Sequence, residues 1–361
     1  MKRILSLSAG AVALLLLTDG ASAQTVATDP VGFTTSTCPA NSDTLLSVPF
    51  TRPPEFVGAT ASATANTITV AGNPWTANQF VYVPVTQPKT YFVLIGPHAS
   101  SNPKEGNMYQ ITSNTTNTLT LNTGTDDVST IAAQTQILVV PYATLASVFP
   151  ASDAGISFIV SPSTFNRQTQ ILIPNYGGVG TNLAPTITYF FFNGAWRRFG
   201  NPATEDHGDD PFTNAGYFTL RNASTGTTLT TLGSVLTKNT TIPLFTQMGA
   251  TSVKQDNFVS IIRPIDVTLN NLGLITSGAF LSSPSQFNRI DELLLFDNTQ
   301  IAINKAPSIT YFYFNSAWRK FGQPITTDFG NDVITAGTGF IIRKGGTATG
   351  ASSPWKNSPT Y

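Results

Sequence analysis

The chain has 361 residues, of which 11% are charged, and its 19 basic and 19 acidic side chains give a net charge of zero. Soluble domains usually contain about 25% charged residues, so the surface here must be built mainly from Thr, Ser and Asn. Nucleic-acid binding needs clustered Lys and Arg, and the sequence has no basic stretch. The composition argues against a nucleic-acid partner and favours neutral partners, such as glycans or other protein copies.

The first residues predict export. Lys2 and Arg3 precede the apolar run Ala9–Leu17, and Ala21–Ala23 has the small-residue pattern of a cleavage site. We expect residues 1–23 to be a signal peptide and the mature chain to be extracellular, at the cell surface or periplasmic. No later apolar run reaches the length of about 18 residues that a membrane helix needs, so no transmembrane helix is expected in the mature chain.

A short strand is predicted at 30–34, and the segment 43–53 has the same pattern as 256–264, where the second copy of a repeat opens. The strand at 30–34 resembles segments 215–218 and 337–340, so we expect it to complete a neighbouring module or to add to a second chain. Cys38 lies between these two segments and is the single cysteine, so a disulfide framework is not expected. It is either a buried hydrophobe or a thiol that forms an intermolecular disulfide.

Residues 56–142 are predicted to form a small β-barrel, SH3-like or related, inserted in a loop of the first module. Short β-branched or aromatic runs alternate with Gly, Pro and Asn turns, as in small barrels. These runs are 66–70, 79–85, 90–96, 107–112, 117–121 and 136–142. The sequence pattern interrupted after 43–53 resumes at 144–150, and loops accept insertions because closure entropy rises slowly with length.

The segment ITYFFFNGAWRRFG, residues 187–200, predicts a β-hairpin. Asn193-Gly194 between two apolar runs is a strong signal for a two-residue turn. Directly opposed residues share a face of a hairpin. One face therefore carries Phe190, Phe192, Ala195, Arg197 and Phe199, and the other carries Tyr189, Phe191, Trp196 and Arg198.

The same hairpin recurs 122 residues later. Residues 184–202 and 306–324 are identical at 14 of 19 positions, and SPSTFNR at 161–167 matches SPSQFNR at 283–289. The sequence thus predicts an all-β fold of two duplicated β-sandwich-like modules, with a small β-barrel inserted in the first. We assign 24–55 and 143–230 to the first module, 231–255 to a linker and 256–361 to the second module.

Comparison of the two copies suggests which hairpin face is buried. The face with Phe190 and Arg197 is unchanged in the second copy, so we expect it to face the core, with Arg197 paired to an acidic side chain or reaching past the sandwich edge. The other face changes at Phe191 and Arg198 and is expected to be more exposed. The candidate ligand or partner face is therefore Tyr189, Phe191, Trp196 and Arg198, with Tyr311, Tyr313, Trp318 and Lys320.

An acidic loop follows each hairpin. Its carboxylates are either turn residues that cap backbone amides or ligands of a calcium ion, the one cofactor considered. The candidate ligands are Asp206, Asp209, Asp210, Asp328 and Asp332. His207 and Asp209 are replaced by Phe329 and Asn331 in the second copy. The sequence has no nucleophile elbow, zinc-protease motif or phosphate loop, so no catalytic residue is assigned.

The segments DPVGF (29–33) and SDTLLSVPFTRPP (42–54), the repeated hairpin and GTGFIIRKGG (337–346) resemble a family of uncharacterised exported bacterial proteins. The resemblance covers most of the mature chain. It implies export and repeated modules, and it brings no activity or site residues.

Three functions follow as hypotheses. The first is an exported, non-enzymatic structural or adhesive surface protein that is able to self-assemble. The second is a carbohydrate-binding protein that uses the Tyr/Trp faces. The third is a secreted hydrolase with a site at the junction of the insert and a module, which would need a pair of carboxylates there.

Overall fold

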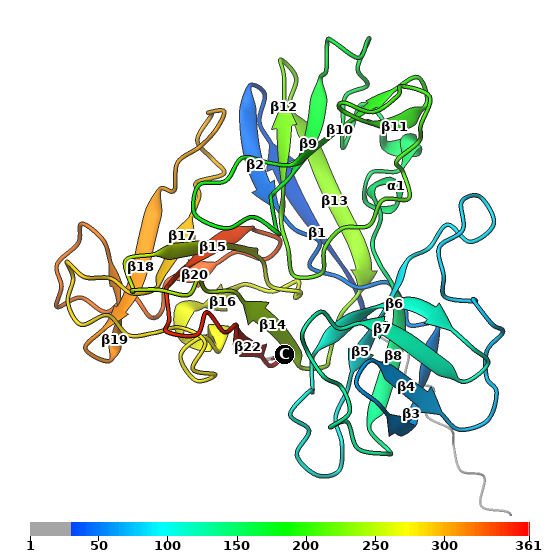
Figure 1. The fold of residues 1–361 in the computed structure, drawn as a ribbon. Coiled ribbons are helices and arrows are strands. Elements are labelled where there is room, and N and C mark those ends of the chain that lie inside the picture. Colours follow the sequence, from blue (N-terminus) through cyan, green and yellow to red (C-terminus); the bar gives the residue numbers. More distant parts are fainter. Residues whose placement is uncertain (1–29, 360) are drawn as a thin grey trace, which may run out of the picture.

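The computed structural model describes residues 30–359 and 361, so the predicted signal peptide lies outside the described residues. The fold is almost entirely β, with two five-stranded sheets, small two-stranded sheets and one closed barrel. Figure 1 shows the first module at the top, the second module at the left and the barrel at the lower right. The predicted fold class is confirmed. None of the described helices is long and apolar enough to cross a membrane.

The first module is built on an antiparallel sheet with strand order β11-β10-β9-β12-β2. These strands are β2 (Ser42–Leu46), β9 (Thr169–Ile173), β10 (Ile187–Phe192), β11 (Ala195–Arg198) and β12 (Phe218–Asn222). The strand ribbon β1 (Val31–Cys38) and β13 (Thr227–Ser234), the helix α1 (Leu145–Val148) and the 3-10 helix η1 (Ala151–Asp153) complete the module. The first strand therefore pairs with β13 of its own module. It completes its own module and not a neighbouring one, and its addition to a second chain stays a prediction.

The second module repeats this arrangement with strand order β15-β21-β17-β18-β19. Its strands are β15 (Lys254–Val259), β17 (Glu292–Leu295), β18 (Ile309–Phe314), β19 (Ala317–Lys320) and β21 (Phe340–Gly345). Its smaller elements are β14 (Thr240–Leu244) paired with β22 (Ser353–Asn357), β16 (Val267–Thr268) paired with β20 (Val333–Ile334), and the 3-10 helix η2 (Leu269–Leu272). The predicted linker, 231–255, contains the end of β13, all of β14 and the start of β15. It belongs to the two modules and is not a linker.

The inserted segment closes into a six-stranded barrel with strand order β3-β4-β7-β6-β5-β8. Its strands are β3 (Phe56–Ala63), β4 (Thr67–Val70), β5 (Tyr91–Ile95), β6 (Met108–Asn114), β7 (Thr118–Asn122) and β8 (Gln136–Pro141). The run 79–85 forms turns instead of the predicted strand. Pro84 has no N–H for a strand ladder, and Val85 has a left-handed φ of 70°. The sixth strand of the barrel is instead β3, a segment that the sequence analysis did not predict to be a strand.

The two modules meet through reciprocal polar contacts. Arg221 Nε donates to Asp43 Oδ1 at 2.7 Å in the first module, and the backbone N–H of Asn304 in the second module donates to Asp43 Oδ2 at 2.7 Å. The mirror set is Arg343 Nε to Asp256 Oδ1 at 2.7 Å and the Asn182 N–H to Asp256 Oδ2 at 2.8 Å. Each module thus donates a backbone hydrogen bond to the aspartate of the other module's ion pair, as in a two-fold symmetric interface.

The barrel is attached to the second module as well as to the first. Thr241 on β14 donates its N–H to Gly106 O at 2.9 Å and its hydroxyl to Glu105 O at 2.8 Å. Outward-facing barrel residues such as Phe92 and Leu138 join the hydrophobic core of the second module. The three parts of the chain therefore come together at one junction.

Candidate functional site

The hairpin face predicted to be the more exposed one is buried. Trp196 is 2% exposed and Trp318 is 1% exposed. Trp196 packs against Phe149 and Phe158, and its Nε1 donates to Phe149 O at 3.2 Å. The reason is that the segments around α1 and the β1–β13 ribbon cover this side of the sheet, and they lie far from the hairpin in sequence.

The candidate ligand or partner face is therefore corrected. Five of its eight residues are buried: Tyr189, Phe191, Trp196, Tyr311 and Trp318. The other three are partly buried: Arg198, Tyr313 and Lys320. Buried rings fill the core and offer no surface to a ligand. The change from Phe191 to Tyr313 is tolerated because both rings pack edge-on against the neighbouring Trp.

The face predicted to be the core is mixed. Phe190 and Arg197 are buried, while Phe199 is exposed. Arg197 donates from Nε to Phe192 O at 3.2 Å and from Nη1 to Glu205 O at 2.8 Å. It therefore satisfies backbone carbonyls and does not pair with an acidic side chain or reach past the edge of the sandwich.

Each module carries an exposed aromatic cluster that the sequence analysis did not identify. Phe165 is 94% exposed and its counterpart Phe287 is 88% exposed. Beside each, an arginine stacks on the exposed ring at the end of the hairpin, with 4.5 Å from Cζ to the ring centroid in both copies. We name these clusters tip 1 and tip 2. Tip 1 consists of Phe165, Arg167 and Phe199, and tip 2 consists of Phe287, Arg289 and Phe321.

Local hydrogen bonds fix the conformation of both tips. In tip 1, Arg167 Nη1 donates to Thr164 O at 2.7 Å, and the Asn166 N–H donates to Ser163 Oγ at 3.0 Å. The matching bonds in tip 2 are Arg289 Nη1 to Gln286 O at 2.9 Å and the Asn288 N–H to Ser285 Oγ at 3.1 Å. The loops therefore present their Phe side chains in a defined position.

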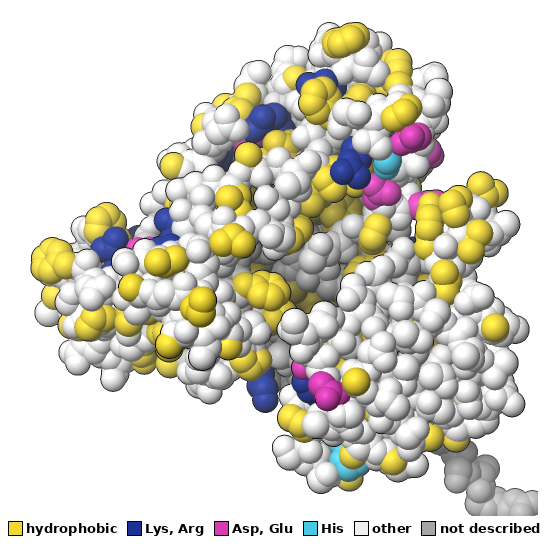
Figure 2. Space-filling model, viewed as in Figure 1, with side chains coloured by type: hydrophobic (Ala, Val, Ile, Leu, Met, Phe, Trp, Pro, Cys, Tyr) yellow, Lys and Arg dark blue, Asp and Glu magenta, His cyan; other side chains and the backbone are white. Residues whose placement is uncertain are grey.

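The two tips differ in charge. Arg167 Nε donates to the neutral Gln170 at 3.3 Å, whereas Arg289 Nε forms an ion pair with Glu292 at 2.6 Å. Figure 2 shows yellow hydrophobic and dark blue basic side chains together at the top, over the first module, and at the far left, over the second. The available signal in the sequence was a Phe retained between turn-forming residues in both SPSxFNR segments.

The acidic loops hold the hairpins in place. Asp206 Oδ1 accepts the N–H of Trp196 at 3.2 Å and that of Gly208 at 2.9 Å, and Asp210 Oδ2 accepts the Tyr189 hydroxyl at 2.6 Å. Asp328 and Asp332 make the equivalent contacts in the second copy. Within residues 30–359, no group of three or more His, Cys, Asp or Glu side chains is arranged to hold a metal ion. Calcium binding stays a prediction.

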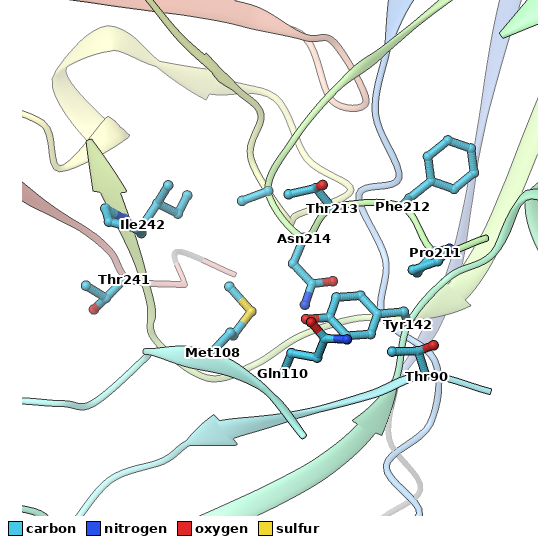
Figure 3. A pocket seen from close by; sticks show the side chains of 12 residues that line it. Thr90, Met108, Gln110, Tyr142, Pro211, Phe212, Thr213, Asn214, Thr241 and Ile242 are labelled. Atoms are coloured by element: carbon cyan, nitrogen blue, oxygen red, sulfur yellow. The ribbon is translucent and has the colours of Figure 1, made fainter. Parts of the chain in front are cut away.

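Cys38 and the junction between the barrel and the modules were the remaining candidates from the sequence. Cys38 is a free, buried thiol whose pKa burial raises to about 11, so it is the buried hydrophobe and not a free surface thiol. A cavity of about 320 Å³ lies where the barrel and the modules meet (Figure 3). Its described lining contains no carboxylate or histidine, so it lacks the acid and base that the hydrolase hypothesis needs there.

No family model, no curated protein and no solved structure matches the chain.

Proposed function

We propose that the chain is an exported, non-enzymatic adhesive protein that attaches to an extended, weakly charged polymer, such as a glycan, through tip 1 and tip 2. The observation that carries the proposal is the exposure of Phe165 and Phe287 at equivalent positions of both copies. Single exposed apolar residues are common. Here the exposed ring recurs in both copies, on a loop fixed by the same hydrogen bonds and beside the same stacked arginine.

The position of the tips favours a repeating target. Figure 1 shows the two hairpin ends far apart, at the top and at the left of the molecule, so both tips cannot enclose one small ligand. Two weak sites on one rigid body bind a polymer or an array more tightly than either site alone. Each tip offers an open aromatic face and, in tip 1, a guanidinium without an acidic partner.

The chain itself is the second candidate partner. Val31 and Phe33 on β1 and Leu232 on β13 are exposed, and Phe33 lies opposite Leu232 in the ribbon. This apolar strip offers a self-assembly surface separate from the tips.

The test measures binding of the purified chain to immobilised polysaccharides and to immobilised copies of itself. We expect Phe165→Ser or Phe287→Ser to weaken binding to a polysaccharide about 10²-fold, and the double variant to abolish it, because avidity is lost. Folding should be unaffected, since changes at exposed sites usually alter stability by less than about 0.5 kcal/mol. Phe245→Ser is the matched control, because Phe245 is an exposed Phe outside both tips.

Two results would contradict the proposal. One is a double variant that binds polysaccharide as well as the unmodified chain does. The other is an unmodified chain that binds only copies of itself, with the interaction lost in Phe33→Ser, which would favour self-assembly through the β1–β13 ribbon.

A further inference from the structure

The junction cavity is built by three separate parts of the chain. The barrel contributes Thr90, Met108, Gln110 and Tyr142, the first module contributes 211–215, and β14 of the second module contributes 241–243. Its volume of about 320 Å³ is at the small end of the range of ligand pockets. Gln110 is exposed, so a small molecule can enter from that side.

One polar group in the cavity is unsatisfied. Asn214 Nδ2 is buried and has no hydrogen-bond partner among the described residues. A buried donor without a partner costs about 1–3 kcal/mol. In Figure 3 the Asn214 amide points toward the Gln110 amide and the Tyr142 hydroxyl, which come from β6 and from the residue after β8. Three hydrogen-bonding groups from two parts of the chain thus converge on one space.

The second copy shows that the shared turn does not require this amide. Asn214 corresponds to Ala336, and the following residues, Ala215 and Gly337, have the same left-handed backbone with φ of 56° and 74°. The turn therefore forms equally with a methyl side chain. The amide is present only in the copy whose turn lines the junction cavity.

The chemistry of the cavity defines the class of ligand. The described lining contains no charged side chain, so a charged ligand would lose its hydration without compensation. Burial raises the pKa of Tyr142 to about 12, so its hydroxyl remains a donor at neutral pH. The two amides each donate and accept, and the Tyr142 ring and Met108 supply apolar surface. This combination matches a molecule with several hydroxyl groups and some C–H surface.

We propose that the junction cavity binds a small, neutral, polyhydroxylated molecule, a single sugar or a polyol, with Asn214, Gln110 and Tyr142 hydrogen-bonded to its hydroxyl groups. This site is separate from the tips and does not depend on their function.

Titration calorimetry and ligand-observed NMR on the full chain test this proposal. The probes are glucose, galactose, mannose, sorbitol and myo-inositol, each neutral, with glucuronate and glucosamine as charged comparisons. We expect saturable binding of at least one neutral probe and no binding of the charged ones. Tyr142→Phe and Asn214→Ala should each weaken binding about tenfold, because each removes one hydrogen-bonding group.

The controls separate this site from the tips and from folding defects. Phe165→Ser should bind the neutral probe as the unmodified chain does. Tyr142→Phe keeps the ring and its packing, so it remains informative where a larger change such as Asn214→Leu fails to fold. The proposal is overturned if no neutral probe binds, which would leave water as the occupant of the cavity. It is equally overturned if Tyr142→Phe and Asn214→Ala bind like the unmodified chain.

Discussion

The two modules have the same strand order but differ in the pair of side chains that they bury at one equivalent place, which is neutral in one module and charged in the other. In the first module, Thr169 Oγ1 donates to Asn222 Oδ1 at 2.8 Å, a neutral buried pair. At the equivalent positions, the second module buries an ion pair between Asp291 and Lys344, both inaccessible to solvent. Asp291 also accepts the backbone N–H groups of Leu281 at 2.7 Å and Gly345 at 2.9 Å.

This difference shows what the module requires. The sheet accepts either pair because every side-chain polar atom of each pair has a hydrogen-bond partner, so neither charge nor neutrality at this position is part of the fold. The cost of breaking the pair should differ, however, because an unpaired buried charge is far more expensive than an unpaired amide.

The largest expected effect comes from removing one charge of the second module. Lys344→Met leaves Asp291 buried without a cation and should lower the free energy of unfolding by about 3–5 kcal/mol. Asn222→Leu in the first module should cost less, about 1–3 kcal/mol. The double variant Asp291→Thr with Lys344→Asn transfers the neutral pair of the first module and should restore most of the loss. Urea unfolding measures all three, and equal losses for Lys344→Met and Asn222→Leu would refute the distinction.

A smaller difference lies in the hairpin turns. Gly194 has φ of 74°, and its counterpart Ser316 has φ of 55°. A left-handed backbone costs a non-glycine residue about 1–2 kcal/mol. Ser316→Gly should therefore stabilise the chain by about 1 kcal/mol, and Gly194→Ser should destabilise it by a similar amount. The midpoints of urea unfolding measure both, and a shift of the same sign for the two substitutions would contradict this account.

The smallest effect concerns the acidic loop and depends on pH. Burial, with the nearby charges of Asp206 and Asp210, raises the pKa of Asp209, and the second copy has Asn331 at this position. Because the folded chain holds this proton more tightly, the residue lowers stability as pH rises from the ordinary Asp pKa of about 3.9 through the raised value. Asp209→Asn should remove this loss, so the variant should gain stability relative to the unmodified chain above that window and not below it.

Thermal unfolding between pH 3 and pH 7 tests this prediction. A difference that does not change with pH would contradict it. The same measurement with added Ca²⁺ tests the calcium prediction, because a calcium-dependent stabilisation that Asp209→Asn removes would place an ion in the first loop.

The repeated local patterns were enough to predict much of the fold. Asn193-Gly194 between two apolar runs predicted the hairpin, and the duplicated segments predicted two equivalent modules with an insertion in the first. These features depend on neighbours in sequence or on internal repetition. The strand β14 was missed because Thr240–Leu244 is short and is interrupted by Pro243, and its pairing partner β22 lies more than a hundred residues away.

The faces of the hairpin could not be predicted in the same way. Lack of change between the two copies does not indicate burial, because the unchanged face includes the exposed Phe199 and Phe321. Burial of Trp196 is decided by Phe149 and Phe158, which approach from distant segments. The junction cavity likewise depends on contacts among separate parts of the chain, which no local pattern encodes.

The reciprocal contacts around Asp43 and Asp256 have a consequence for how the chain behaves on dilution. A surface that is complementary to a copy of itself is the surface of a homodimer, whose assembly depends on protein concentration. Joining both copies in one chain makes their association intramolecular, so it no longer follows mass action. The chain therefore keeps its paired architecture at any dilution.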